Sequence, residues 1–289
     1  MRITTMSSIG VVIYSYKGKS LKDVVQKINE NSSKEHTINI YILDQSPLIK
    51  NEYYNSISNV SYKHKFWDYP YGQCLYRFET ARNIQEEFIL IMSDNILVNN
   101  NWDLELIKNY KTNSVISGKG IPSITNDNFY FYNNSLNSDD FILSNFVDKD
   151  FIFISKELFH NTNYPTFLKY NGEAEYLSMY WFTRGIDIYS CPSSFYTKNN
   201  QNSIDILYTP YSKDHNYNEI IKIIKNQHSS FFDPGTARTV NDFLSYHNID
   251  LEKIFPLPFQ TNDVEYDCYN NDFDKLDGRK FIGHLHYIY

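Results

Sequence analysis

Short, continuously apolar strands separated by amphipathic helices are the feature that most constrains the fold of this sequence. Three runs consist mainly of β-branched and other large apolar residues, at 9–16 (IGVVIYSY), 36–46 (HTINIYILDQS) and 86–92 (EEFILIM). Such runs are typical of strands that are buried on both faces of a parallel sheet. The first two enclose a helical pattern and therefore predict a βαβ unit, whose handedness places both strand ends at the same edge of the sheet.

The remaining elements continue this alternation. The first helix is expected after Ser20, which is predicted to be its N-cap, with Leu21, Val24, Val25 and Ile28 on one apolar face. Further strands are expected at 59–67, 114–118, within 146–159 and at 186–192, and further helices after Gly72 and at 102–110, 172–185, 217–227 and 236–247. The alternation predicts an α/β fold with a doubly wound sheet. A polar break at 198–203 is a candidate boundary.

Composition limits the classes of protein to which the chain can belong. Its 289 residues are 42% hydrophobic and 21% charged, as expected for a globular protein with a sizeable core. The net charge of −7 does not favour binding to a nucleic-acid backbone. The three cysteines form no CxxC pair, and no apolar run is long enough to span a bilayer. The N-terminus lacks the features of a signal peptide, so a cytoplasmic protein without a membrane partner is expected.

Aromatic residues make up 17% of the sequence, with 26 Tyr and 20 Phe. Codon bias in an AT-rich genome explains such a composition, and a surface that stacks on sugars or bases is the functional alternative. The sequence contains neither G-x-G-x-x-G nor a Walker loop, which argues against dinucleotide oxidoreductases and P-loop enzymes.

Polar residues at the strand ends form the first candidate site. Residues 14–17, Asp44-Gln45 and Ser93-Asp94-Asn95 each follow or end a predicted strand. Ligands of doubly wound sheets bind beyond the carboxyl ends of the strands. A carboxylate there can hold a divalent cation that neutralises a pyrophosphate, although Asp and Asn after a strand also simply form turns.

Several short motifs then occur in a fixed order. They are Ser15-Tyr16-Lys17-Gly18, a helix start from Gly72 to Arg77, Ser93-Asp94-Asn95 followed by Trp102-Asp103, Gly172-Glu173-Ala174-Glu175, the segment 181–187 followed by Pro192, and Gly235–Thr239 with Ile249-Asp250 beyond. In order and spacing they resemble the GT-A class of nucleotide-sugar glycosyltransferases. They resemble more closely the cytoplasmic GlcNAc-transferase family that acts on protein hydroxyproline. The resemblance covers roughly residues 9–250.

The resemblance implies a fold and a set of site residues. The fold is a GT-A (Rossmann-like), doubly wound mixed sheet with a C-terminal helical or irregular extension. Asp94 and Glu173 are the implied catalytic residues, and Asp94 and Asn95 the implied ligands of Mn²⁺ or Mg²⁺. Substrate contacts are implied for Ser15, Tyr16, Lys17, Asp44, Arg77, Ser93, Glu175 and Arg238. Counting back from Ser93 places Arg77 at the family position, so Arg82 is expected to be an ordinary surface residue.

Two departures from the family pattern concern the metal. Ser93 stands where the family has the first metal-binding Asp, and Asn95 stands where it has His; the later His falls near Tyr196. Three interpretations stay open: a weaker Mg²⁺ or Mn²⁺ site, a metal-independent enzyme that uses Arg or Lys, and an inactive protein. Glu173 and Glu175 diverge by about 200° on a helix, so only one of them is expected to point into the site.

The resemblance predicts transfer of a sugar from UDP-GlcNAc or another UDP-sugar to a hydroxyl acceptor. The acceptor is a protein, a glycan or, for a viral source, a modified nucleic acid, which the net charge disfavours. The alternatives are a catalytically degenerate protein that binds sugar nucleotides or glycans, and a nucleotidyltransferase. The expected organisation is a nucleotide-sugar-binding half at 1–110, an acceptor-side half of the same domain at 111–200 and a C-terminal extension at 201–289.

Overall fold

The computed structural model describes ten stretches of the chain and two single residues. The stretches are 6–15, 20–45, 51–65, 73–118, 123–125, 128–130, 138–168, 172–192, 194–198 and 232–247, and the single residues are Ile220 and Ile223. All of them belong to one compact unit. None of the helices among them is long and apolar enough to cross a membrane. The predicted boundary at 200/201 and the segment after 247 lie outside the described residues.

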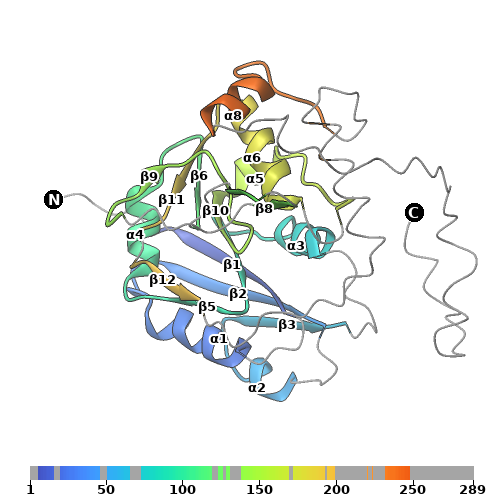
Figure 1. Ribbon diagram of the computed structural model, residues 1–289. Coiled ribbons are helices and arrows are strands. Elements are labelled where there is room, and N and C mark those ends of the chain that lie inside the picture. The colour runs from blue at the N-terminus through green and yellow to red at the C-terminus, as the bar shows by residue number, and fades with distance from the viewer. Residues whose placement is uncertain are drawn as a thin grey trace, which may run out of the picture. The chain divides into compact units, whose positions relative to one another are not determined.

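An eight-stranded mixed sheet forms the centre of the molecule (Figure 1). Its strand order is β3-β2-β1-β4-β10-β6-β11-β9. The strands are β1 (Ser8–Ser15), β2 (Thr37–Asp44), β3 (Val60–His64), β4 (Phe88–Ser93), β6 (Ser114–Ser117), β9 (Ile142–Leu143), β10 (Phe151–Ser155) and β11 (Asp187–Ser190). The four neighbouring strands β3, β2, β1 and β4 are parallel to one another. Strand β10 runs antiparallel to both β4 and β6. The predicted doubly wound mixed sheet is confirmed.

The register brings four strand ends to one edge of this sheet. Ser15 at the end of β1 pairs with Asp44 at the end of β2, and Tyr14 pairs with Ser93 at the end of β4. Because β10 runs in the opposite direction, its beginning lies beside the end of β4, where Ser93 N donates to Asp150 O at 3.0 Å. We call this side of the sheet, with Ser15, Asp44, Ser93 and Asp150, the carboxyl edge.

Helices cover both faces of the sheet, and alternate residues of each strand supply the two cores. Ile9, Val11 and Ile13 of β1 pack in the layer of α1 (Leu21–Glu30) and α4 (Trp102–Asn109). Val12 packs in the opposite layer, which contains α3 (Gln73–Ala81), α5 (Lys156–His160) and α6 (Glu173–Thr183). Nine of the eleven residues of α6 are buried, so this helix crosses the interior of its layer. Trp102 and Trp181 are both at most 1% exposed and belong to these cores.

Several short elements were not predicted from the sequence. These are α2 (Asn51–Asn55), β5 (Ile96–Val98), β7 (Ser123–Thr125), β8 (Asn128–Tyr130), β9 and β12 (Tyr196–Lys198). Strands β5 and β12 form an antiparallel ribbon in which Ile96 pairs with Lys198. Strand β5 begins directly after Asn95, so this ribbon starts beside the carboxyl edge.

Ser20 is the N-cap residue of α1, as predicted, although its side chain makes no capping hydrogen bond. One predicted helix start needs correction. The last described helix, α8 (Val240–Tyr246), is shorter than the predicted 236–247 because Thr239 ends the preceding loop as an N-cap. Its hydroxyl accepts from Asp242 N at 3.0 Å, and Asp242 Oδ2 accepts from Thr239 N at 2.7 Å. Of the helix predicted at 217–227, only Ile220 and Ile223 are described, and both are helical and buried.

Replacing Thr239 with Ala is expected to lower the free energy of unfolding by about 1 kcal/mol, because it removes one half of this capping box. Thr239→Ser retains the hydroxyl and is the matched control, expected to unfold within a few tenths of a kcal/mol of the wild type. Urea denaturation of both variants measures the difference. Equal losses in the two variants would contradict the capping role of the hydroxyl.

Candidate functional site

Side chains from neighbouring strand ends meet at the carboxyl edge. Ser15 Oγ donates a hydrogen bond to Asp94 Oδ2 at 2.7 Å, which connects the ends of β1 and β4. On the next strand, Tyr62 OH donates to Asp44 Oδ2 at 2.7 Å. The predicted gathering of strand-end polar residues is therefore confirmed for Ser15, Asp44, Ser93 and Asp94. Tyr16 and Lys17 lie outside the described residues.

Asp94 has an unusual electrostatic environment. It is 7% exposed, and burial raises the pKa of its carboxyl to about 6. The hydrogen bond from Ser15 and the charge of Arg77 lower the pKa, whereas Asp44 and Asp150 raise it. A buried carboxylate with a raised pKa lacks a strong counter-ion, and such groups are often found at functional sites.

Asn95, the residue after Asp94, has a side-chain oxygen that accepts no hydrogen bond from the described residues. Asn95 Oδ1 is buried and has no hydrogen-bond partner. Buried polar atoms of this kind are rare in proteins, and a bound ion or water is one of their usual partners. Within the described stretches, no group of three or more His, Cys, Asp or Glu side chains is close enough to hold a metal. Asp94 and Asn95 nevertheless fit Mg²⁺ or Mn²⁺ bound in the manner common for nucleotide substrates, through one or two protein oxygens and the substrate phosphates.

Arg77 and Glu173 form a buried ion pair beneath the carboxyl edge. Arg77 Nη1 lies 2.9 Å from Glu173 Oε2 and donates to Lys149 O at 3.0 Å, and Nη2 donates to Ser93 Oγ at 3.4 Å. Glu173 also accepts a hydrogen bond from Tyr164 OH. The two charged side chains are only 2% and 0% exposed. Arg77 therefore reaches Asp94 through its neighbour Ser93. The burial of Arg77 and Glu173 favours positioning roles over the substrate contact and the catalytic role that the resemblance implies for them.

Glu175 differs from Glu173 as the helical spacing predicts. It is partly exposed, whereas Glu173 is fully buried two residues earlier in α6. Burial raises the pKa of Glu175 to about 7, with Glu173 adding to this effect and Lys149 opposing it. A carboxyl group that titrates near neutral pH can exchange a proton with a hydroxyl group.

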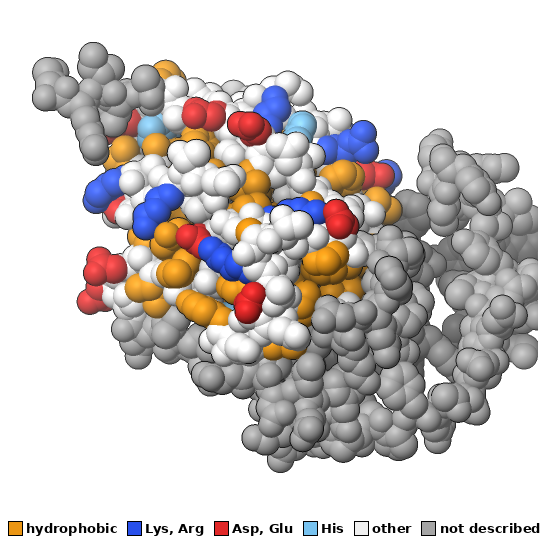
Figure 2. All heavy atoms as spheres, turned by 90° about the horizontal axis from the view of Figure 1, so that it is seen from above, with side chains coloured by type: hydrophobic (Ala, Val, Ile, Leu, Met, Phe, Trp, Pro, Cys, Tyr) orange, Lys and Arg blue, Asp and Glu red, His pale blue; other side chains and the backbone are white. Residues whose placement is uncertain are grey.

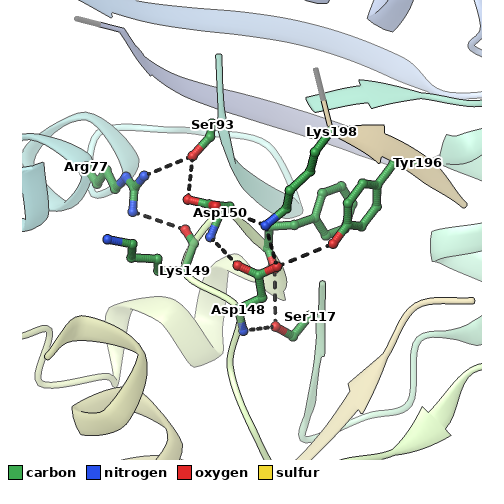
Figure 3. Close-up of polar contacts among 9 residues, drawn as sticks. Arg77, Ser93, Ser117, Asp148, Lys149, Asp150, Tyr196 and Lys198 are labelled. Atoms are coloured by element: carbon green, nitrogen blue, oxygen red, sulfur yellow. Dashed lines mark hydrogen bonds and ion pairs between the residues drawn. The ribbon is translucent and has the colours of Figure 1, made fainter. Parts of the chain in front are cut away.

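Three acidic and basic residues at this edge were not identified from the sequence: Asp148, Asp150 and Lys198 (Figure 3). Lys198 Nζ lies 3.1 Å from Asp148 Oδ2 and 3.0 Å from Asp150 Oδ2. Ser93 Oγ donates to Asp150 Oδ1 at 2.8 Å, so these residues adjoin the strand end that carries Asp94. The sequence signal was the pair of acids in the segment 146–151 (FVDKDF) directly before a buried strand. The partner Lys198 was not visible because it comes from the unpredicted β12.

Arg238 was predicted to contact substrate, and the structure places it elsewhere. Its Nη2 lies 2.6 Å from Asp187 Oδ1, and its guanidinium lies 4.7 Å from the ring centroid of Phe182. Asp187 begins β11. Strand β11 is parallel to β6, and both β6 and β4 are antiparallel to β10, so β11 runs in the same direction as β4. Arg238 is therefore at the amino end of these strands, opposite the carboxyl edge, and its contacts hold the segment before α8 to the end of α6.

Two further sequence features have structural roles. Arg82 is exposed, as predicted, with its guanidinium 5.6 Å from the ring of Phe78. Asp103 of the Trp-Asp pair is fully buried and accepts hydrogen bonds from Ser33 N at 2.8 Å and Ser33 Oγ at 2.6 Å. Trp102 Nε1 donates to Ile28 O at 3.1 Å. The pair therefore fastens α4 to the end of α1.

Comparison with known proteins identifies the fold. No protein-family model and no curated protein matches the sequence. Among solved structures, the mannosyltransferase PcManGT from Pyrobaculum calidifontis, in complex with GDP-Man and Mn²⁺, aligns with a TM-score of 0.55 at 10% identity over 85% of this chain and 70% of that one. S. aureus TarS aligns with a TM-score of 0.54 at 14% identity over 78% of this chain, which spans only 41% of the TarS chain. The α/β fold is thus shared with a glycosyltransferase, which confirms the predicted fold class. Neither structure bears on the resemblance to the hydroxyproline-modifying family, which stays a prediction.

Proposed function

We propose that this protein is a glycosyltransferase that moves a sugar from a nucleotide-sugar donor, UDP-GlcNAc or another UDP-sugar, to a hydroxyl group of a protein, a glycan or a modified nucleic acid. One observation carries the proposal. Ser15, Asp44 and Asp94 meet at the carboxyl edge of a sheet whose fold is shared with a mannosyltransferase that was solved with GDP-Man and Mn²⁺. Ligands of open α/β sheets bind at this edge.

Each residue of the edge has a role in the proposed reaction. Asp44 is fully buried and accepts a hydrogen bond from Tyr62, so it would support the nucleoside end of the site from beneath. Asp94 and Asn95 would hold Mn²⁺ or Mg²⁺ together with the donor phosphates. A bound cation supplies the positive charge that stabilises the leaving diphosphate. Arg77, fixed by Glu173, orients Ser93 and through it the strand end that carries Asp94.

The acceptor side is assigned to Glu175. Its partial exposure and its pKa of about 7 suit exchange of a proton with the acceptor hydroxyl at neutral pH. Glu173, which is fully buried and ion-paired with Arg77, supports the first turn of α6 on which Glu175 stands. On the face shown in Figure 2, Lys and Arg side chains lie among Asp and Glu side chains. This mixture of charges favours neither an acidic nor a basic acceptor.

Two measurements test the function. Thermal unfolding with UDP-, GDP-, CMP- and TDP-sugars, with and without Mn²⁺, should show a rise in melting temperature for one nucleotide class, because a ligand that binds only the folded state stabilises it. Release of nucleoside diphosphate from that donor then reports turnover. Binding without release under any metal would indicate a degenerate binding protein, which the loss of the family's Asp and His at Ser93 and Asn95 favours. Release of pyrophosphate would indicate a nucleotidyltransferase.

Donor binding that depends on Mn²⁺ is expected to weaken as the pH falls through about 6, because Asp94 then takes up a proton and loses the charge that holds the cation. The measurement is the Mn²⁺-dependent shift in melting temperature at a fixed donor concentration across this pH range. Mn²⁺-independent binding of the nucleoside diphosphate is the control. A Mn²⁺ effect of constant size down to pH 5 would contradict the assignment of Asp94 as a ligand.

A further inference from the structure

The residues Asp148, Asp150 and Lys198, which we call the lysine cluster, lie directly beside the proposed donor site. Asp150 accepts from Ser93 Oγ, and Ser93 is the residue before Asp94. In Figure 3 the Lys198 side chain reaches down from its strand between the two aspartates, while Arg77 approaches Ser93 and Lys149 from the other side. A donor whose diphosphate is held at Asp94 would have its sugar within reach of this cluster.

The cluster has unused capacity for hydrogen bonds. An ammonium group has three N–H donors. Two of those of Lys198 are directed to Asp148 Oδ2 and Asp150 Oδ2, and the third has no partner among the described residues. The side chains are also accessible, with exposed fractions of 24% for Lys198, 27% for Asp150 and 10% for Asp148. The cluster can therefore bind further polar groups without breaking its own contacts.

Charge restricts the kind of ligand. Carboxylates accept hydrogen bonds but donate none, so the two aspartates do not suit a phosphate, and the ammonium already occupies the position that a metal cation would take between them. Asp150 stays ionised, because Lys198, Lys149 and Arg77 hold its pKa below the ordinary value against the effect of burial. A neutral ligand with several hydroxyl groups satisfies both kinds of residue, since hydroxyls donate to carboxylates and accept from an ammonium.

The backbone at Gly118 approaches this cluster closely. Gly118 follows β6, and a Cβ atom at this position would lie 2.6 Å from Tyr196 OH and 2.7 Å from Asp148 Oδ2. Beneath the cluster, the rings of Phe151 and Tyr196 stack with centroids 5.3 Å apart. The cluster is thus a partly exposed polar group that is fixed on a rigid apolar base.

We propose that Lys198, with Asp148 and Asp150, recognises the hydroxyl groups of the transferred sugar and so sets the sugar specificity of the enzyme. This inference rests on the proposed function, since it assumes that a nucleoside diphosphate binds at Asp94. It assigns the lysine cluster to the sugar part of the donor and leaves the diphosphate to Asp94 and its neighbours.

The test compares affinities for UDP and UDP-GlcNAc, and for GDP and GDP-mannose, by calorimetry with the whole chain. In the pair that the wild type binds, Lys198→Met is expected to weaken binding of the nucleotide sugar by about 10- to 100-fold, because a lost hydrogen bond to a charged group has this magnitude. Binding of the nucleoside diphosphate should weaken by less than about threefold. Lys108→Met is the matched control, since Lys108 is 71% exposed on α4, and both affinities should be unchanged.

Further outcomes separate the alternatives. Lys198→Met leaves two aspartates without their cation, so the double variant Lys198→Met/Asp148→Asn is made to restore the charge balance and retain the fold. Like the single variant, it should bind the nucleotide sugar more weakly than the wild type does, with little change in its affinity for the nucleoside diphosphate. Equal weakening of both ligands, or of neither, would overturn the inference while leaving the proposed function intact. A wild type that binds no nucleoside diphosphate at all would overturn the proposed function and this inference with it.

Discussion

Asp94→Asn is expected to reduce sugar transfer by at least about 10²- to 10³-fold, the range observed when one preorganised electrostatic group is removed from an active site. The substitution preserves the volume of the side chain and leaves an oxygen that can accept the hydrogen bond from Ser15 Oγ, which lies 2.7 Å from Asp94 in the structure. It removes only the negative charge that would hold the cation. The measurement is the rate of nucleoside diphosphate release at saturating donor, acceptor and Mn²⁺.

The stability of the same variant separates loss of function from loss of fold. The pKa of Asp94 is raised to about 6 from an ordinary 3.8, so this group contributes stability that is fully present below about pH 3.8 and is lost as the pH rises through about 6. Asparagine does not ionise, and Asp94→Asn should therefore melt at or above the wild-type temperature at pH 8. Asp23→Asn, at an exposed position of α1, is the control for activity. An Asp94→Asn enzyme with near wild-type turnover would rule out the assigned role.

Arg77→Met is expected to lower the free energy of unfolding by about 3–5 kcal/mol, because it leaves Glu173 buried without a counter-ion. The pair is 2% and 0% exposed, and Arg77 makes further contacts with Ser93 and Lys149 O. Glu173→Gln should destabilise the protein for the same reason. Denaturant unfolding gives the free energies, and the exposed pair of Lys27 and Glu30 on α1 is the comparison, whose disruption should cost less than about 1 kcal/mol.

The double variant Arg77→Met/Glu173→Leu distinguishes pairing from packing. If each single variant is unstable because one charge is left alone, removing both charges should recover much of the loss. If the losses of unfolding free energy in the two single variants add up in the double variant, the packing of these side chains, and not their pairing, stabilises this part of the interior. Activity is a second readout: a double variant that recovers stability should still be impaired in turnover, since Ser93 and the strand end at Asp94 would lack the guanidinium that orients them.

The central sheet could be predicted because its signal is local. The runs around Val12, Ile40 and Leu90 are apolar on both faces, and no other element of a soluble α/β protein needs that pattern. The same locality explains why Ser15, Asp44 and Asp94 were identified, since each simply follows such a run. Parallel strands then bring the three together without further information.

The errors come from pairings between distant residues. Lys198 reaches Asp148 and Asp150 only because β12 pairs with β5, about a hundred residues earlier, and neither strand has more than three residues. Arg238 matched a family motif, but its position follows from the direction of β11, which the motif does not specify. Glu173 was expected to face the ligand because of the family resemblance. The spacing of Glu173 and Glu175 fixes the angle between them, but not which one points to the interior.

The ribbon of β5 and β12 has one more consequence, which concerns how specificity could change. Only three residue pairs hold Ile96, Leu97 and Val98 to Lys198, Thr197 and Tyr196. Side chains alternate between the two faces of a strand, so a slip by a single residue would turn Thr197 toward Asp148 and Asp150 and rotate the ammonium outward. A one-residue insertion in the connection before β12 would place Thr197 opposite Ile96 and so replace a charged contact with a hydroxyl in one step, without any change to the residues of the sheet itself.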